Sequence, residues 1–470
     1  MSSDPSLLAR LRNIRKRRGE FRSTETTSNE LARLRSLLPR DSVEREVFDL
    51  AEIGGLSYKT IAAKLNFSER HVYRVRARMV EMIDEGEVAI ASRQSVNRTT
   101  GLAMPRVLFK YGRFNDALAH IRRLERSGLS SEMRIGLLAL EAMIACRLGR
   151  GTNGAALLAT AQQLIDTLPQ EDQPGAKRRV AYTAAFADYC EGLYESTIDR
   201  CELAVRPFLA QSGDDDVARD LIFLGIVHQE GGSPERAVEV LTAAEHILKR
   251  RPAPSFADLA DVYVHRSFAL GSLPDRLDDA QRDAARAMEI ADTHGLPCEY
   301  VWGRLASGVL NELTGRPSEA LADVQEALDL GRSLLSGDAL ARTHFISSRV
   351  EICAQKFDGT LDHLAEAKEL LHHDSFLGDT ILPLVEARVH RASGNYRSTI
   401  VAATRAIDGF ARRQTSTHYF GEAYLARAIA GHALGVDVRD DAEAAVTLLR
   451  RGGWVNDQAR ALEFAARVLH

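Results

Sequence analysis

The sequence has no long hydrophobic run. None of its apolar stretches approaches the roughly 20 residues that a membrane-spanning helix needs. Its first 18 residues are basic, and the apolar segment and cleavage site of a secretory signal do not follow them. We therefore expect a cytoplasmic protein without a membrane partner.

Cysteine is scarce and scattered. The five cysteines are an odd number and none belongs to a Cys-x-x-Cys pair, which argues against a disulfide framework or a zinc site. The chain also lacks the phosphate-binding Gly-x-x-x-x-Gly-Lys pattern, the Gly-x-Ser-x-Gly elbow, the His-Glu-x-x-His motif and an EF-hand loop. We expect neither an enzyme nor a bound metal or cofactor.

Length and charge indicate more than one part. A chain of 470 residues exceeds the usual single domain, so several domains or a long repeat array are expected. Residues 1–80 contain 17 Lys/Arg and 10 Asp/Glu, a charge of +7; because the whole chain carries −4, residues 81–470 carry −11. A basic N-terminal part on an acidic remainder indicates an anionic partner for the basic part.

Helical spacing dominates beyond about residue 104. Leu321, Val324 and Leu328 recur at three and four residues, as amphipathic helices require. The stretch Gly-Arg-Pro-Ser-Glu at residues 315–319 is a helix start, because proline tolerates the first turn and glutamate favours the positive end of the helix dipole.

A turn mark recurs along the same region. Each mark is a glycine followed, usually five residues later, by a small residue that lets the next helix pack closely. The successive marks, about 37 to 44 residues apart as in solenoid repeats, are Gly112 with Ala117, Gly149 with Gly154, Gly192 with Thr197, Gly232 with Ala237, Gly271 with Ala280, Gly315 with Ala320, the degenerate stretch Lys356 to Thr360, Gly394 with Thr399, and Gly435 with Ala442.

These marks resemble the tetratricopeptide repeat family, best at Tyr111-Gly112-x-Phe114-x-x-Ala117 and Gly394-x-Tyr396-x-x-Thr399. The resemblance covers residues 104–450, although the period exceeds the family's usual 34. It implies an all-α chain with a right-handed α-solenoid of about nine helix pairs, whose groove binds a peptide or protein. A plain helical bundle is the alternative.

Some residues of the predicted first helices carry polar or aromatic tips that a groove could use, but ordinary repeat packing explains them equally well, and none is assigned to a site. They are Tyr182, Tyr263, Trp302, Arg342 and His344. Residues 456–470 are expected to form a terminal capping helix.

Residues 43–83 predict three short helices joined by tight connections. The helices span residues 43–53, 58–65 and 69–83, and Asn66 stands in the second connection, where a positive φ is needed. The expected core of this unit is Ile61, Ala62, Leu65, Phe67, Val72 and Val75.

The stretch Gly55-Leu56-Ser57-Tyr58-Lys59-Thr60-Ile61-Ala62-x-x-Leu65-Asn66-Phe67-Ser68-Glu69-x-x-Val72, with Arg74-x-Arg76-Ala77-Arg78, resembles a bacterial helix-turn-helix of the sigma-factor region-four and LuxR type. Asn66 stands where that family usually has glycine. The resemblance implies that the third helix enters the major groove of DNA.

That resemblance assigns contacts to the second and third helices. The expected base contacts are Glu69, Arg70, Tyr73 and Arg74, because arginine can pair two acceptors on guanine and glutamate can accept from cytosine. The expected backbone contacts are Ser57, Tyr58, Lys59, Ser68, His71, Arg76 and Arg78. A solvated helical face is the alternative for the arginines.

We therefore expect a basic, flexible arm at residues 1–27, a helix-turn-helix domain at 28–83 (the head), a linker at 84–103 and the helical repeats at 104–470 (the body). The arm is either a DNA-tracking segment or a solubilising tail. The first 40 residues hold one aromatic, Phe21, so this chain is not expected to melt promoters as a complete sigma factor does.

The predicted function is that of a sequence-specific DNA-binding transcription regulator. The head would bind double-stranded DNA as a homodimer, and the body would bind a peptide or protein effector. The alternative is a scaffold or adaptor whose head docks on RNA polymerase or another protein. The operator, the effector and the direction of regulation have no signature in the sequence.

Overall fold

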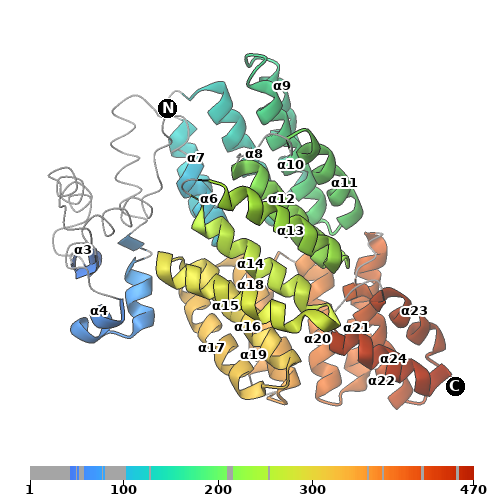
Figure 1. Cartoon of the computed structure of the whole chain (residues 1–470). Helices are drawn as coiled ribbons and strands as arrows, with labels where there is room; N and C mark the ends of the chain where they lie inside the picture. Colours follow the sequence, from blue (N-terminus) through green and yellow to red (C-terminus); the bar gives the residue numbers. More distant parts are fainter. Residues whose placement is uncertain are drawn as a thin grey trace.

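The computed structural model is all-α. It describes residues 43–48, 50–51, 58–76, 78–79, 102–125, 129–208, 215–251, 254–356, 359–372, 375–413, 418–450 and 455–469, and these contain no strand. A small head of short helices lies beside a large curved body of paired helices (Figure 1). The predicted fold class is confirmed.

The described part of the body contains nine helix pairs and a final helix. In chain order they are α6 (Ala103–Lys110) with α7 (Phe114–Glu125), α8 (Ser131–Arg147) with α9 (Gly151–Ile165), α10 (Gln173–Cys190) with α11 (Tyr194–Val205), α12 (Asp215–Glu230) with α13 (Pro234–Lys249), α14 (Phe256–Gly271) with α15 (Leu277–His294), α16 (Pro297–Leu313) with α17 (Pro317–Leu334), α18 (Gly337–Cys353) with α19 (Thr360–Leu370), α20 (Leu382–Ala392) with α21 (Tyr396–Arg412), α22 (His418–Ala433) with α23 (Arg439–Leu449), and the capping helix α24 (Val455–Leu469). The last helix, α24, covers nearly the same residues as the expected terminal capping helix at 456–470.

The turn marks have the expected geometry. Gly112 and Gly394 take φ values of 72° and 74°, and the small partners Ala117 and Thr399 are fully buried where the two helices of a pair meet. A left-handed residue at the end of a helix turns the chain back, and a small side chain lets the second helix approach.

Two marks differ from the prediction. Gly271 closes α14 without a positive φ, and a 3-10 turn, Pro274–Arg276, leads into α15. In the degenerate copy Gln355, at φ 58°, takes the left-handed position. Both connections still bury the small residue that follows, Ala280 and Thr360. Close helix contact is therefore kept at every mark.

The body curves until its beginning meets its seventh pair. The Ser336 N–H, just before α18, donates to the Tyr111 carbonyl after α6 at 2.9 Å. Gly112 lies against the same segment, since a Cβ built on it would come within 1.9 Å of the Ser336 carbonyl oxygen. Arg147 of α8 pairs with Asp338 at the start of α18. The superhelix is thus closed on itself.

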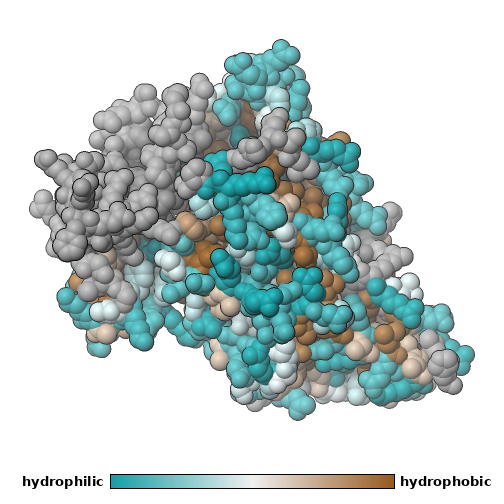
Figure 2. All heavy atoms as spheres, viewed as in Figure 1, coloured by the Kyte–Doolittle hydropathy of each residue, from teal (hydrophilic) through white to brown (hydrophobic). Residues whose placement is uncertain are grey.

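Apolar side chains pack between the helices of the body, and its outer surface is mostly hydrophilic. Figure 2 shows hydrophobic side chains gathered between the helices of the body, with hydrophilic ones over them. The largest buried cluster runs across pairs, from Phe186 of α10 through Leu224 of α12 to Phe410 of α21. Among the described residues, no helix is long and apolar enough to cross a bilayer.

The head consists of α3 (Val43–Phe48), α4 (Tyr58–Leu65) and a third helix at residues 69–76 and 78–79. Asn66 has a φ of 55°, and the Phe67 N–H closes the turn on the Ala62 carbonyl at 2.9 Å. The expected core forms: Ile61, Ala62, Val72 and Val75 are buried, and Leu65 and Phe67 pack against them. The arm and most of the linker lie outside the described residues.

Gly112→Ala and Gly315→Ala test the closure of the superhelix. Both glycines have a φ of 72°, but a Cβ on Gly112 meets Ser336 whereas a Cβ on Gly315 meets nothing within 4 Å. The backbone conformation costs about 1–2 kcal/mol in either variant. The clash should destabilise Gly112→Ala by about 1–3 kcal/mol more.

Urea unfolding followed by far-ultraviolet circular dichroism measures the difference. Equal losses in the two variants would mean that the first and seventh pairs do not touch.

Candidate functional site

The closed superhelix surrounds a cavity of about 560 Å³. Its walls come mainly from the first helix of each pair, from α6 to α22, because these helices form the inner face of the curve. A cavity of this size is in the range that accepts a small molecule or part of a peptide.

Charge lines the cavity unevenly. The cations are Arg106, Lys110, Arg147, Arg178, Arg179, Arg219, Arg342, Arg349 and Arg388, and the anions are Asp216, Asp220, Glu230, Asp258, Asp261 and Asp338. Nine cations face six anions inside a body whose overall charge is negative. The cavity therefore favours an anionic ligand.

Aromatic rings supply most of the remaining wall. Eleven of the chain's 29 aromatic residues line the cavity. They are Phe109, Tyr182, Phe186, Tyr189, Tyr194, Phe223, Phe268, Trp302, Phe345, Phe376 and Tyr419. Such a wall suits a ligand that has apolar groups as well as negative charge.

Arg106 is the cation best placed to receive an anion. Its side chain is exposed to the hollow interior, and it forms no hydrogen bond or ion pair with any described residue. Burial lowers the pKa of Arg106, Asp216 opposes that shift, and Arg219 and Arg179 add to it. An anion beside Arg106 would relieve the repulsion among these three cations.

A hydrogen-bonded network ties three pairs together across the cavity. Arg342 of α18 donates to Glu230 of α12 at 3.1 Å and to the Tyr189 hydroxyl of α10 at 3.0 Å. The Tyr189 and Tyr194 hydroxyls donate to the other Glu230 oxygen at 3.0 and 3.1 Å. The network satisfies Glu230, which is 9% exposed.

Lys110 joins the start of the body to its middle. Its ammonium group donates to Asp261 of α14 at 2.7 Å and to Glu299 of α16 at 2.6 Å. Burial disfavours the charge of Lys110, but these two carboxylates raise its pKa well above the usual value. Burial raises the pKa of Glu299, which shares the cation with Asp261.

Three of the five residues that the sequence offered for a groove line this cavity, namely Tyr182, Trp302 and Arg342. The other two do not. His344 is fully buried against His363 of α19, and the buried Tyr263 donates to Glu245 of α13 at 2.6 Å. Sequence reasoning missed Arg106, Lys110 and Glu230. Their only signal in the sequence was a charged residue on a predicted first helix, and nothing nearby in the sequence identified its partner.

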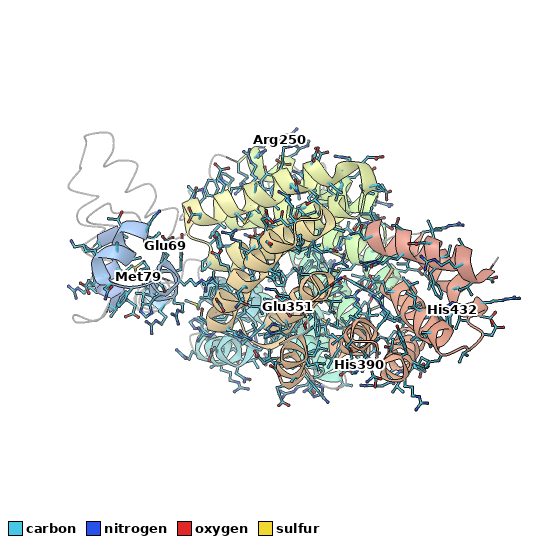
Figure 3. The ribbon with its side chains drawn as sticks, turned by 90° about the horizontal axis from the view of Figure 1, so that it is seen from below. Glu69, Met79, Arg250, Glu351, His390 and His432 are labelled. Carbon is cyan, nitrogen blue, oxygen red and sulfur yellow. The ribbon has the colours of Figure 1, made fainter. Side chains whose placement is uncertain are left out.

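The predicted DNA contacts of the head fall into three groups. Lys59, Ser68, Glu69, Arg74 and Arg78 are exposed; Tyr58, Arg70, His71 and Tyr73 are half-buried; Arg76 is buried. Ser57 lies outside the described residues. The third helix, marked in Figure 3 by Glu69 and Met79, lies beside the body.

Three side chains of the third helix contact the body. Arg70 pairs with Asp329 of α17, and Tyr73 donates to Asp292 of α15. Arg76 Nη2 donates to the His294 carbonyl at 3.0 Å, at the end of α15. A DNA-reading surface would be open to solvent. Arg70, Tyr73 and Arg76 are instead held against the body.

No family model and no curated protein matches the sequence. Among solved structures, the chain is similar to a Rap protein complexed with competence and sporulation factor, with a TM-score of 0.53 and 13% identity over 80% of this chain and 99% of that one. It is less similar to aspartyl phosphate phosphatase F from Bacillus subtilis (TM-score 0.43, 13% identity, 76% and 96%) and to yeast Tom70 (0.38, 11%, 84% and 93%).

The similarity to the Rap protein concerns the fold. At such identity it supports a tetratricopeptide-like helical-repeat body and transfers no residue roles. In the described part of the chain, no group of three His, Cys, Asp or Glu side chains is arranged to hold a metal ion, and the five cysteines are free.

Arg342→Met tests the network across the cavity. It leaves the Glu230 carboxylate without its cation, and the expected loss of stability is on the order of 2 to 4 kcal/mol. Adding Glu230→Gln removes the buried charge and should restore part of that loss, as a double-mutant cycle in thermal unfolding would report. Additive losses would show that the two groups act independently.

Proposed function

We propose that this chain is a transcription regulator whose head binds double-stranded DNA through a helix-turn-helix, as a homodimer, and whose cavity binds a peptide effector. The arrangement that carries the proposal is the pairing of the head with a cationic and aromatic cavity. The head supports the DNA-binding half of the proposal, and the cavity supports the effector half.

The head supports the DNA-binding half. The left-handed turn at Asn66 sets α4 and the third helix across one another, as in units that place a helix in the major groove. Arg74 on the third helix and Lys59 on α4 are exposed. Cations so placed can contact bases and phosphates.

The cavity supports the effector half. An excess of cations beside aromatic rings suits a short peptide that ends in a free carboxylate and carries apolar side chains. The similar Rap protein was solved with competence and sporulation factor. We assign Arg106 the carboxylate, because it lines the cavity among other cations and forms no hydrogen bond with any described residue.

Selection from a pool of random duplexes by the full chain tests the DNA-binding half. Arg74→Ala should relax the selected sequence, whereas Arg123→Ala, an exposed arginine of α7, should leave it unchanged. Affinity for the selected duplex should fall steeply between about 50 and 200 mM salt.

Recovery of no preferred duplex at any salt would contradict DNA reading. It would favour the alternative, an adaptor whose head docks on RNA polymerase.

Calorimetric titration with a library of short peptides tests the effector half. Peptides with a free C-terminus should bind more tightly than their C-terminal amides, and Arg106→Gln should abolish that difference while preserving the fold. An equal affinity of acids and amides for the unaltered chain would rule out the assigned carboxylate site.

A further inference from the structure

The body covers one side of the third helix, while Glu69 and Arg74 of that helix remain exposed. Arg70, Tyr73 and Arg76 recur every three residues and so lie along one side of that helix, while Val72 and Val75 face the core of the head. Each member of this stripe contacts the body: Arg70 at α17, Tyr73 within α15 and Arg76 at the last residue of α15.

The body receives this stripe with acidic and aromatic groups. Asp329 pairs with Arg70, and Asp292 accepts from the Tyr73 hydroxyl. The Tyr73 ring stacks on Tyr300 of α16, with centroids 6.4 Å apart and planes at 15°. Two carboxylates thus hold the groups that would otherwise meet DNA.

Arg76 has its seat at the end of α15. It is 6% exposed, lies over the Tyr58 ring at 4.8 Å and donates to the His294 carbonyl. A Cβ built on Gly295 would lie 0.9 Å from Arg76 Nη1, so the seat exists only because residue 295 has no side chain. Nε and Nη1 of Arg76 are buried and have no hydrogen-bond partner among the described residues. The contact therefore depends on one hydrogen bond and on the lack of a side chain at residue 295.

We propose that α15, α16 and α17 form an autoinhibitory surface that competes with DNA for the third helix of the head. This inference rests on the proposed DNA binding. A helix must bring its outward face into a groove about 12 Å wide, and the body occupies that space while Arg70, Tyr73 and Arg76 are docked. Docking therefore lowers the affinity of the chain for DNA, because the head must leave this surface before these side chains can enter the groove.

Two independent changes to the body should release the head, and neither alters a residue of the head. Asp292→Asn with Asp329→Asn removes the two carboxylate charges. Gly295→Ala fills the seat of Arg76, and Gly315→Ala is its matched control, because Gly315 also has a positive φ but open space around it.

The experiment measures two quantities in the full chain. Fluorophores at cysteines replacing the exposed Lys64 of α4 and Arg282 of α15 report the separation of head and body without DNA. Fluorescence anisotropy reports affinity for a random-sequence duplex and for a selected one. Both releasing changes should increase the separation and raise duplex affinity on the order of 5- to 100-fold, and Gly315→Ala should do neither.

A charge swap provides the matched control for the ion pair. Asp329→Arg alone should release the head, and combining it with Arg70→Asp should restore docking while leaving DNA binding weak. Failure of the swap to restore docking would mean that Arg70 and Asp329 do not pair.

The outcomes separate the two proposals. An unchanged separation in both releasing variants overturns autoinhibition, and so does a larger separation with unchanged, measurable duplex affinity. Released heads that bind no duplex at any salt overturn the proposed DNA binding itself.

Discussion

Closure of the superhelix determines the rest of this structure. The hydrogen bond from Ser336 to Tyr111, and the ion pairs of Lys110 with Asp261 and Glu299, join helices that are far apart in the sequence. They turn an open groove into a cavity in which charges act through a poorly solvated interior. The pair of Lys110 with Glu299 also holds the first turn of α16, next to Tyr300, on which Tyr73 of the head stacks.

One helix takes part in both sites. Glu299, in the first turn of α16, binds Lys110 on the cavity wall, and the next residue, Tyr300, stacks on Tyr73 of the head. An anion bound in the cavity would compete with Glu299 for Lys110. The first turn of α16 therefore lies between Lys110 of the cavity wall and the docked head.

Local signals made much of the fold predictable. Most turn marks can be found from a glycine and a small residue close to it in the sequence. Asn66 likewise predicts the tight turn of the head, because asparagine accepts a positive φ. Gln355 was missed because a left-handed residue is usually glycine or asparagine, and here it is glutamine. Closure was not predicted, since Lys110 and Asp261 are 151 residues apart and nothing in either stretch identifies its partner.

The candidate sites were only partly predictable for the same reason. Helical spacing separates Arg70 and Tyr73 from the core-facing Val72, but spacing cannot distinguish a face turned to solvent from one turned to another domain. The burial of Arg76 depends on Gly295, a residue 219 positions away that carries no signal of a docking surface. Contacts between distant parts of the chain appear only in three dimensions.

A structure of the full chain bound to a duplex that it selects would test the central claim most directly. The account predicts the third helix in the major groove, with Arg70 and Tyr73 on DNA and Asp329 and Asp292 free of them. Bound DNA with both contacts to the body intact, and the third helix away from the groove, would contradict it.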